Sequence, residues 1–175
     1  MNGSKDLVQR NNVWSLSPLL SESGPKLVDL WKAQMAWCAE VTPVLEHLQK
    51  PASPIQEVLG RLDRLRNLHQ DWDSYGSDAP TSLAVAIARH LIWIVLTRTY
   101  ALAEDRSIPY AVVPLSGGGV QVEWRCGAKA IEVEIGPDGH FGYLLVEGSG
   151  TQRRFDERDG IDESAIVNLV ISVVL

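Results

Sequence analysis

Residues 109–147 read PYAVVPLSGGGVQVEWRCGAKAIEVEIGPDGHFGYLLVE, and this stretch decides the fold. Apolar and polar residues alternate through most of it, which is the pattern of strands with one buried face. Three short segments interrupt the alternation, namely Gly117-Gly118, Gly127-Ala128 and Pro137-Asp138-Gly139. Each of them is typical of a hairpin turn. The stretch therefore predicts an antiparallel meander of four strands.

Each turn implies a strand register. A two-residue loop at Gly117-Gly118 pairs Val113 with Val122, and the next two turns pair Trp124 with Ile131 and Ile135 with Phe141. Together the registers place eight apolar residues on one face: Val113, Val122, Trp124, Ile131, Val133, Ile135, Phe141 and Tyr143. A slip of one residue in any hairpin would break this agreement, because side chains alternate between faces.

Apolar residues at helical spacing flank the meander. A first helix is predicted from Pro25, with Pro43 expected to kink or split it. Ser53, followed by proline, is typical of the N-cap of a second helix. Thr81 or Ser82 is expected to cap a third helix, and Asp162 a fourth. Residues 151–155 are compatible with a short edge strand.

These elements predict an α+β fold, with an antiparallel four- to five-stranded β-meander and helices packed on one face. A chain of 175 residues favours one domain. Residues 1–24 are rich in Ser, Asn and Gly, and we expect a flexible lead-in there. The single α+β domain is expected to span residues 25–175.

Composition and charge limit the functions and the cellular locations that this protein can have. The formal net charge of −6 argues against direct nucleic-acid binding, which needs clustered Lys and Arg. Cys38 and Cys126 lie far apart and favour two reduced thiols in a reducing compartment. The N-terminus lacks the pattern of a secretory signal, and the apolar runs at 91–96 and 166–175 are too short to cross a bilayer. We therefore expect a cytoplasmic protein without a membrane partner.

The segment His69–Gly76 concentrates acidic and aromatic residues. Its spacing of Asp71, Asp73 and Gly76 is similar to the start of a calcium-binding loop, but Ser82 stands where such a loop needs a bidentate Glu. In a structural interpretation, Asp73 and Ser74 fix the turn while Trp72 and Tyr75 fill the gap between two helices. In the alternative interpretation, Trp72, Asp73 and Tyr75 bind a partner.

The polar face of the predicted sheet is the second candidate. The registers place Glu123 opposite Glu132, and Gln121 opposite Glu134. Like charges facing each other across a sheet cost a few tenths to about 1 kcal/mol, so something should compensate them. Arg125, a bound cation or a basic partner could each do so. An ordinary solvated face with Arg125 as the internal counterion is the plainest interpretation.

The remaining motifs do not indicate a catalytic, phosphate-binding or metal-binding site. The glycines at 117–119 lead into a strand, whereas a phosphate-binding loop leads into a helix. The four histidines show no metal-ligand spacing with one another or with the cysteines, and no nucleophile motif is found. We therefore predict no catalytic residue, no metal and no cofactor.

Several motifs together are similar to those of a group of small bacterial proteins without an established activity. They are Asp71-Trp72-Asp73-Ser74-Tyr75-Gly76-Ser77, then Gly117-Gly118-Gly119-Val120-Gln121-Val122-Glu123-Trp124, and the turn at Asp138-Gly139. The usual pattern of the group is Asn-Trp-Asp-Gly-Tyr-Gly-Ala followed by a Gly-Gly-Ile/Val-x-Leu/Val-Glu-Trp hairpin. The resemblance covers residues 60–147, and it implies a bacterial accessory protein associated with defence or mobile elements.

The sequence favours a non-enzymatic protein-interaction module, meaning an accessory, antitoxin-like or regulatory subunit that binds another, basic protein. The expected partner-binding residues are Trp72, Asp73, Tyr75, Glu123, Arg125, Glu132 and Glu134. One alternative is a metal-dependent hydrolase or nuclease that uses Asp71, Asp73, Glu123, Glu132 and Glu134. It requires the loop acids to lie within about 6 Å of the sheet acids, because two-metal sites hold their ions about 4 Å apart. A further alternative is an acidic DNA mimic.

Overall fold

A computed structural model describes residues 27–48 and 53–175. The chain divides after residue 36 into two units, and residues 37–175 form the second, compact one. The first helix, α1 (Leu27–Leu48), begins in the first unit and runs unbroken through Pro43. The predicted lead-in at residues 1–24 lies outside the described residues.

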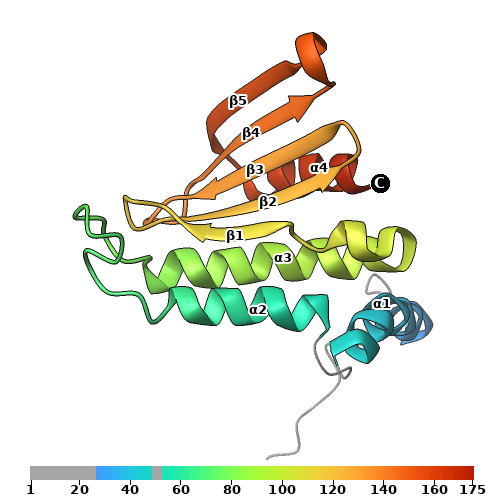
Figure 1. Cartoon of the computed structure of the whole chain (residues 1–175). Helices are drawn as coiled ribbons and strands as arrows, with labels where there is room; N and C mark the ends of the chain where they lie inside the picture. Colours follow the sequence, from blue (N-terminus) through green and yellow to red (C-terminus); the bar gives the residue numbers. More distant parts are fainter. Residues whose placement is uncertain (1–26, 49–52) are drawn as a thin grey trace, which may run out of the picture. The chain divides into compact units, whose positions relative to one another are not determined.

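The second unit contains a five-stranded sheet in which every strand pairs antiparallel with its neighbour in sequence. The strands are β1 (Ala111–Pro114), β2 (Val120–Cys126), β3 (Lys129–Ile135), β4 (Phe141–Glu147) and β5 (Arg154–Ile161). The helices are α2 (Pro54–Leu65), α3 (Ser82–Ala103) and α4 (Glu163–Val174), with short 3₁₀ turns η2 (Glu104–Ser107) and η3 (Gly150–Gln152). Figure 1 shows α4 behind the sheet and α3 alongside β1. The predicted α+β fold is confirmed.

Three predicted helix caps are confirmed. The Ser53 Oγ atom accepts a hydrogen bond from the Gln56 amide at 3.2 Å. Thr81 Oγ1 and Asp162 Oδ1 accept from the amides three residues further on, at 3.1 and 2.9 Å. Each cap satisfies an amide that has no partner within its helix, and so fixes where the helix begins.

Two of the three hairpin registers are confirmed. Trp124 pairs with Ile131, and Ile135 pairs with Phe141, as the turns predicted. The side chains of these residues lie on the face that packs against α3 and α4. Glu123 pairs with Glu132, and Gln121 pairs with Glu134, on the opposite face.

The predicted register of the first hairpin is wrong by one residue. Val112, not Val113, pairs with Val122, so Val112 is 6% exposed whereas Val113 is 37% exposed. The loop contains three residues rather than two: the Leu115 amide donates to the Gly119 carbonyl, and Gly118 has a φ of +81°. A three-residue loop that ends in a left-handed glycine shifts the pairing by one position.

The edge strand β5 is longer than predicted and begins later. The expected segment was 151–155, but β5 spans the eight residues Arg154–Ile161. Most of its side chains are exposed on both faces. Without a buried face, a strand has no apolar alternation, and the sequence pattern therefore missed most of it.

Helix α3 lies at the centre of the core. Ten of its residues are buried, and it contacts α2, α4 and the sheet. By length and composition alone, the segment Ser82–Ser107 could also cross a membrane. The central helix of a globular core passes the same test, because it is apolar around most of its circumference.

Candidate functional site

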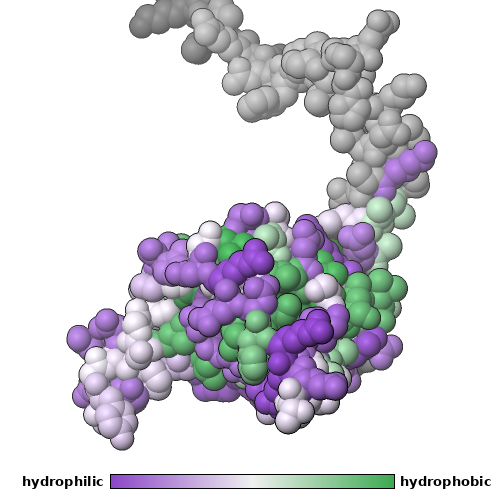
Figure 2. Space-filling model, turned by 90° about the horizontal axis from the view of Figure 1, so that it is seen from above, coloured by the Kyte–Doolittle hydropathy of each residue, from purple (hydrophilic) through white to green (hydrophobic). Residues whose placement is uncertain are grey.

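The sheet face that α3 and α4 leave uncovered, called the open face below, carries both charged and apolar side chains. The pairing places on it Val113, Gln121, Glu123, Arg125, Ala130, Glu132, Glu134, Leu144, Val146, Phe155, Glu157 and Asp159. Phe155 is 65% exposed. Over the surface that Figure 2 draws from above, hydrophilic and hydrophobic residues are interspersed.

Glu123 and Glu132 are held together by a bridging amide. Gln121 Nε2 donates to Glu123 Oε1 at 3.0 Å and to Glu132 Oε2 at 3.4 Å. The Arg125 guanidinium forms its ion pair with Glu123, at 3.0 Å, and stacks over the Tyr110 ring at 4.3 Å from the centroid. Arg125 is thus the internal counterion that the sequence suggested, but its ion pair is with Glu123, not with Glu132.

The charged form of the Glu132 carboxyl group is disfavoured in its place on the open face. Partial burial raises its pKa, and the charges of Glu123 and Glu134 raise it further, while Arg125 opposes them. Ionised Glu132 therefore costs folding free energy, because its charged form is disfavoured in the folded protein. A cation placed beside Glu132 would recover that cost.

A hollow of about 440 Å³, called the acidic groove below, lies on β3, β4 and β5. Its charged lining residues are Glu132, Glu134, Glu157, Asp159 and Arg158. The Arg158 guanidinium already lies 3.5 Å from Asp156. Leu144 supplies apolar surface between the acids. The sequence did not indicate Glu157 and Asp159 as site residues, because the edge strand was predicted at residues 151–155. The charge-rich run Arg154–Asp159 is the sequence feature that could have indicated them.

The loop Asp71–Gly76 is built by its own side chains. Asp73 accepts from the Tyr75 and Ser77 amides and from the Ser77 hydroxyl, at 2.6 to 3.3 Å. These bonds, the Ser77 hydroxyl first, lower the pKa of Asp73. Trp72 is half-buried, and its indole N–H donates to the Asp78 carbonyl at 3.2 Å. Tyr75 is 92% exposed, so the expectation that it fills a gap between helices is wrong.

The loop acids and the sheet acids have separate contacts. The carboxylates of Asp71 and Asp73 accept hydrogen bonds within the loop, whereas Glu123 and Glu132 share Gln121 on the open face. In the described part of the chain, no group of three or more His, Cys, Asp or Glu side chains could hold a metal ion. The metal-dependent alternative therefore lacks a ligand set among these residues.

Trp72→Ala is expected to lower the melting temperature, whereas Tyr75→Ala is expected to leave it within error of wild type. The first change removes half-buried apolar area and an indole hydrogen bond, and the second removes a side chain that is almost fully exposed. Thermal unfolding followed by circular dichroism measures both. Equal melting temperatures for the two variants would show that Trp72 does not anchor the loop.

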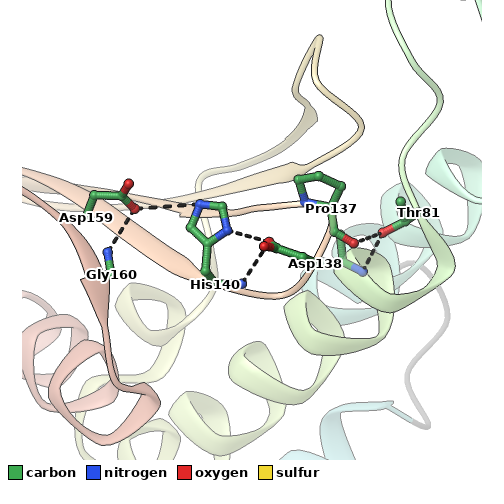
Figure 3. A network of polar contacts seen from close by, with 7 residues as sticks. Thr81, Pro137, Asp138, His140, Asp159 and Gly160 are labelled. Atoms are coloured by element: carbon green, nitrogen blue, oxygen red, sulfur yellow. Dashed lines mark hydrogen bonds and ion pairs between the residues drawn. The ribbon is translucent and has the colours of Figure 1, made fainter.

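His140 joins the turn between β3 and β4 to the end of β5. Figure 3 shows its ring between two carboxylates: Nδ1 contacts Asp138 Oδ1, and Nε2 lies 3.7 Å from Asp159 Oδ1. In the same turn, the Pro137 carbonyl accepts from Thr81 Oγ1 at 2.9 Å, which ties the turn to the start of α3. Both carboxylates, Asp138 first, raise the pKa of His140 above its ordinary value of 6.5.

An NMR pH titration should therefore give His140 a pKa above 6.5, and Asp138→Asn should bring it back toward 6.5. Since the folded-state pKa is raised, the contribution of His140 to stability is complete below pH 6.5 and is lost as the pH rises through the folded-state pKa. The exposed Asp105→Asn is the control and should leave the titration unchanged. An unchanged pKa in Asp138→Asn would refute the pairing.

Comparison of this chain with protein-family models, with curated proteins and with solved structures finds no match.

Proposed function

We propose that this protein is a non-enzymatic interaction module, an accessory, antitoxin-like or regulatory subunit, whose open face binds a basic segment of another protein. The observation that carries the proposal is the acidic groove. Four carboxylates line it, and its one guanidinium is already paired with Asp156. Its excess negative charge is complementary to Lys and Arg side chains.

Glu132 supplies a physical reason for binding. Burial and the neighbouring acids disfavour its charged form, as the raised pKa indicates. A basic side chain seated beside Glu132 would stabilise that charge in a partly dehydrated place, where charge pairs are stronger than in water. Binding should accordingly weaken as salt concentration rises.

Apolar side chains next to the acids extend the proposed contact. Leu144 lies in the acidic groove, and Val146 and Phe155 face each other across β4 and β5 on the same open face. An aromatic side chain that is largely exposed beside charged residues is a common anchor in protein interfaces. The partner would thus present apolar side chains among its basic ones. A cytoplasmic location and a bacterial defence role rest on the sequence alone.

The decisive test neutralises the acidic groove. Wild type and the triple variant Glu132→Gln, Glu134→Gln, Glu157→Gln are immobilised and exposed to lysate of the native host, with proteins quantified by mass spectrometry. The variant should recover at least one protein about tenfold less, equivalent to about 1.4 kcal/mol of binding free energy. Its melting temperature should not fall, because it removes a charge repulsion around Glu132.

A matched control changes three exposed acids outside the open face: Glu46→Gln, Glu104→Gln, Asp105→Asn. Both triple variants alter the net charge from −6 to −3, since each removes three negative charges. The control should recover the same protein as wild type. Identical recovery by all three proteins would contradict the proposal.

A further inference from the structure

The outer edge of β5 has no partner in the part of the chain that the structure describes. The strand order of the sheet is β1-β2-β3-β4-β5, so β5 pairs with β4 on one side only. Among the described elements, β4 alone is in extensive contact with β5. Figure 1 shows β5 as the outermost strand, on the side of the sheet away from α2 and α3. An edge strand directs every second N–H and C=O group away from its neighbour, and these groups are free to pair with another strand.

Several features that usually protect a free edge are missing from β5. Proteins shield such edges with short strands, proline, lysine or bulges. β5 has eight residues, Arg154–Ile161, and none of them is proline or lysine. The one irregularity in its pairing lies at its far end, opposite Phe141 and Gly142. Near its start, Phe155 is 65% exposed, and an exposed aromatic side chain on a free edge favours association.

The charges of β5 have both signs, and their order matches a second copy of the same strand. Two-fold symmetry requires antiparallel pairing in which a central residue lies opposite itself. Centred on Phe155, this pairing brings the two Phe155 rings together and twice places Arg154 opposite Asp156. One position further out, Arg153, whose backbone is also extended, lies opposite Glu157. Opposite charges that face each other across two strands are favourable.

The other symmetric registers oppose like charges. A pairing centred on residue 154, 156, 157, 158 or 159 places a charged side chain directly opposite its own copy. Like charges in this position are destabilising. A centre on Gly160 or Ile161 leaves too little strand, because α4 begins at Glu163. Phe155 is therefore the centre that the sequence of β5 favours.

We propose that two copies of this protein associate edge to edge through β5, in an antiparallel pairing centred on Phe155. The five strands of each copy then form one continuous sheet. A two-fold axis perpendicular to this sheet keeps the open faces of both copies on the same side. The contact involves about five residues from each copy, so the dissociation constant should lie at about 10–100 µM. At about 1 µM the monomer prevails, and unfolding measured there reports on the single chain.

Sedimentation velocity of the full-length protein, from about 1 to about 500 µM, tests the proposal. Wild type should pass from monomer to dimer over this range. Arg154→Asp and Asp156→Arg should each raise the dissociation constant about tenfold or more, because each change opposes two pairs of like charges. An equimolar mixture of these two variants should dimerise like wild type, since every pair between unlike copies again has opposite signs. Arg98→Asp, a charge reversal of an exposed residue on α3, should leave the dissociation constant unchanged.

Wild type that stays monomeric throughout, or a mixture of folded variants that associates no better than its components, would overturn the proposal. Asp156→Arg also removes the acceptor of the Tyr143 hydroxyl, at 2.7 Å. If circular dichroism shows that this variant is unfolded, a second pair of variants decides.

Phe155→Lys places two ammonium groups at the two-fold axis and should raise the dissociation constant about tenfold or more. Tyr75→Lys changes another exposed aromatic residue, in the loop before α3, and should dimerise like wild type. Equal dissociation constants for these two variants would likewise overturn the proposal. The experiment contains no other protein, so its result is independent of whether the acidic groove binds a basic segment.

Discussion

Trp124→Ala is expected to destabilise the protein by about 3–5 kcal/mol, the usual effect of truncating a fully buried aromatic side chain. Trp124 is 0% exposed in the core beneath the sheet. Its indole N–H donates to the Ser107 carbonyl at 3.0 Å, in the turn that follows α3. The truncation would leave a cavity and a buried carbonyl without its partner, and both effects lower the free energy of unfolding.

Thermal and urea unfolding measure this loss. For a domain of this size the melting temperature should fall by about 10 °C or more. Phe155→Ala is the matched control, because it also removes a large aromatic side chain from the sheet, but one that is 65% exposed. Its effect should stay within about 0.5 kcal/mol. A Trp124→Ala protein as stable as this control would contradict the placement of Trp124 in the core.

The second large effect is expected from a single added methyl group. Gly119→Ala should destabilise the protein by about 1–3 kcal/mol, the range for overpacking a site that cannot relax. Its Cβ would lie 2.5 Å from the Ile135 carbonyl oxygen and 3.2 Å from Leu115 Cδ1. The neighbouring Val120 is paired with Ile135 in the β2–β3 ladder, so the backbone cannot easily move aside.

Gly117→Ala, in the same loop, separates the clash from the general effect of replacing a glycine. No atom lies within 4 Å of a Cβ at Gly117. This variant should therefore remain within about 0.5 kcal/mol of wild type in urea unfolding. Equal losses in the two variants would show that the effect comes from the loop backbone and not from contact with β3.

The charged face could be predicted in part. Glu123, Glu132 and Glu134 were expected on one face of the sheet, and the observed register places them there. The turn residues and the two-residue period of the strands were sufficient for this prediction. The β2–β3 and β3–β4 hairpins set the register of these residues, and both have short loops. Glu157 and Asp159 could not be assigned, since only pairing between β5 and β4 brings them to that face.

The sequence by itself determined the helix caps, the α+β class and two hairpin registers, because each depends on interactions between residues close in the chain. The tertiary structure alone decided the first register. The Asp78 amide donates to the Ser116 carbonyl, and the Thr81 amide donates to the Gly118 carbonyl, both at 2.9 Å. These contacts from the segment before α3 hold a three-residue loop, and no local pattern in the glycine run specifies them.

The acidic groove was also decided by the tertiary structure. It combines residues of β3, β4 and β5, which only the pairing of these strands brings together. Tyr75 shows the same limit of sequence analysis at a single residue. Its aromatic side chain suggested that it fills the gap between two helices, yet it is exposed to solvent. Burial and charge clustering depend on neighbours that are distant in the chain, whereas a sequence pattern reports only on residues that are close in the chain.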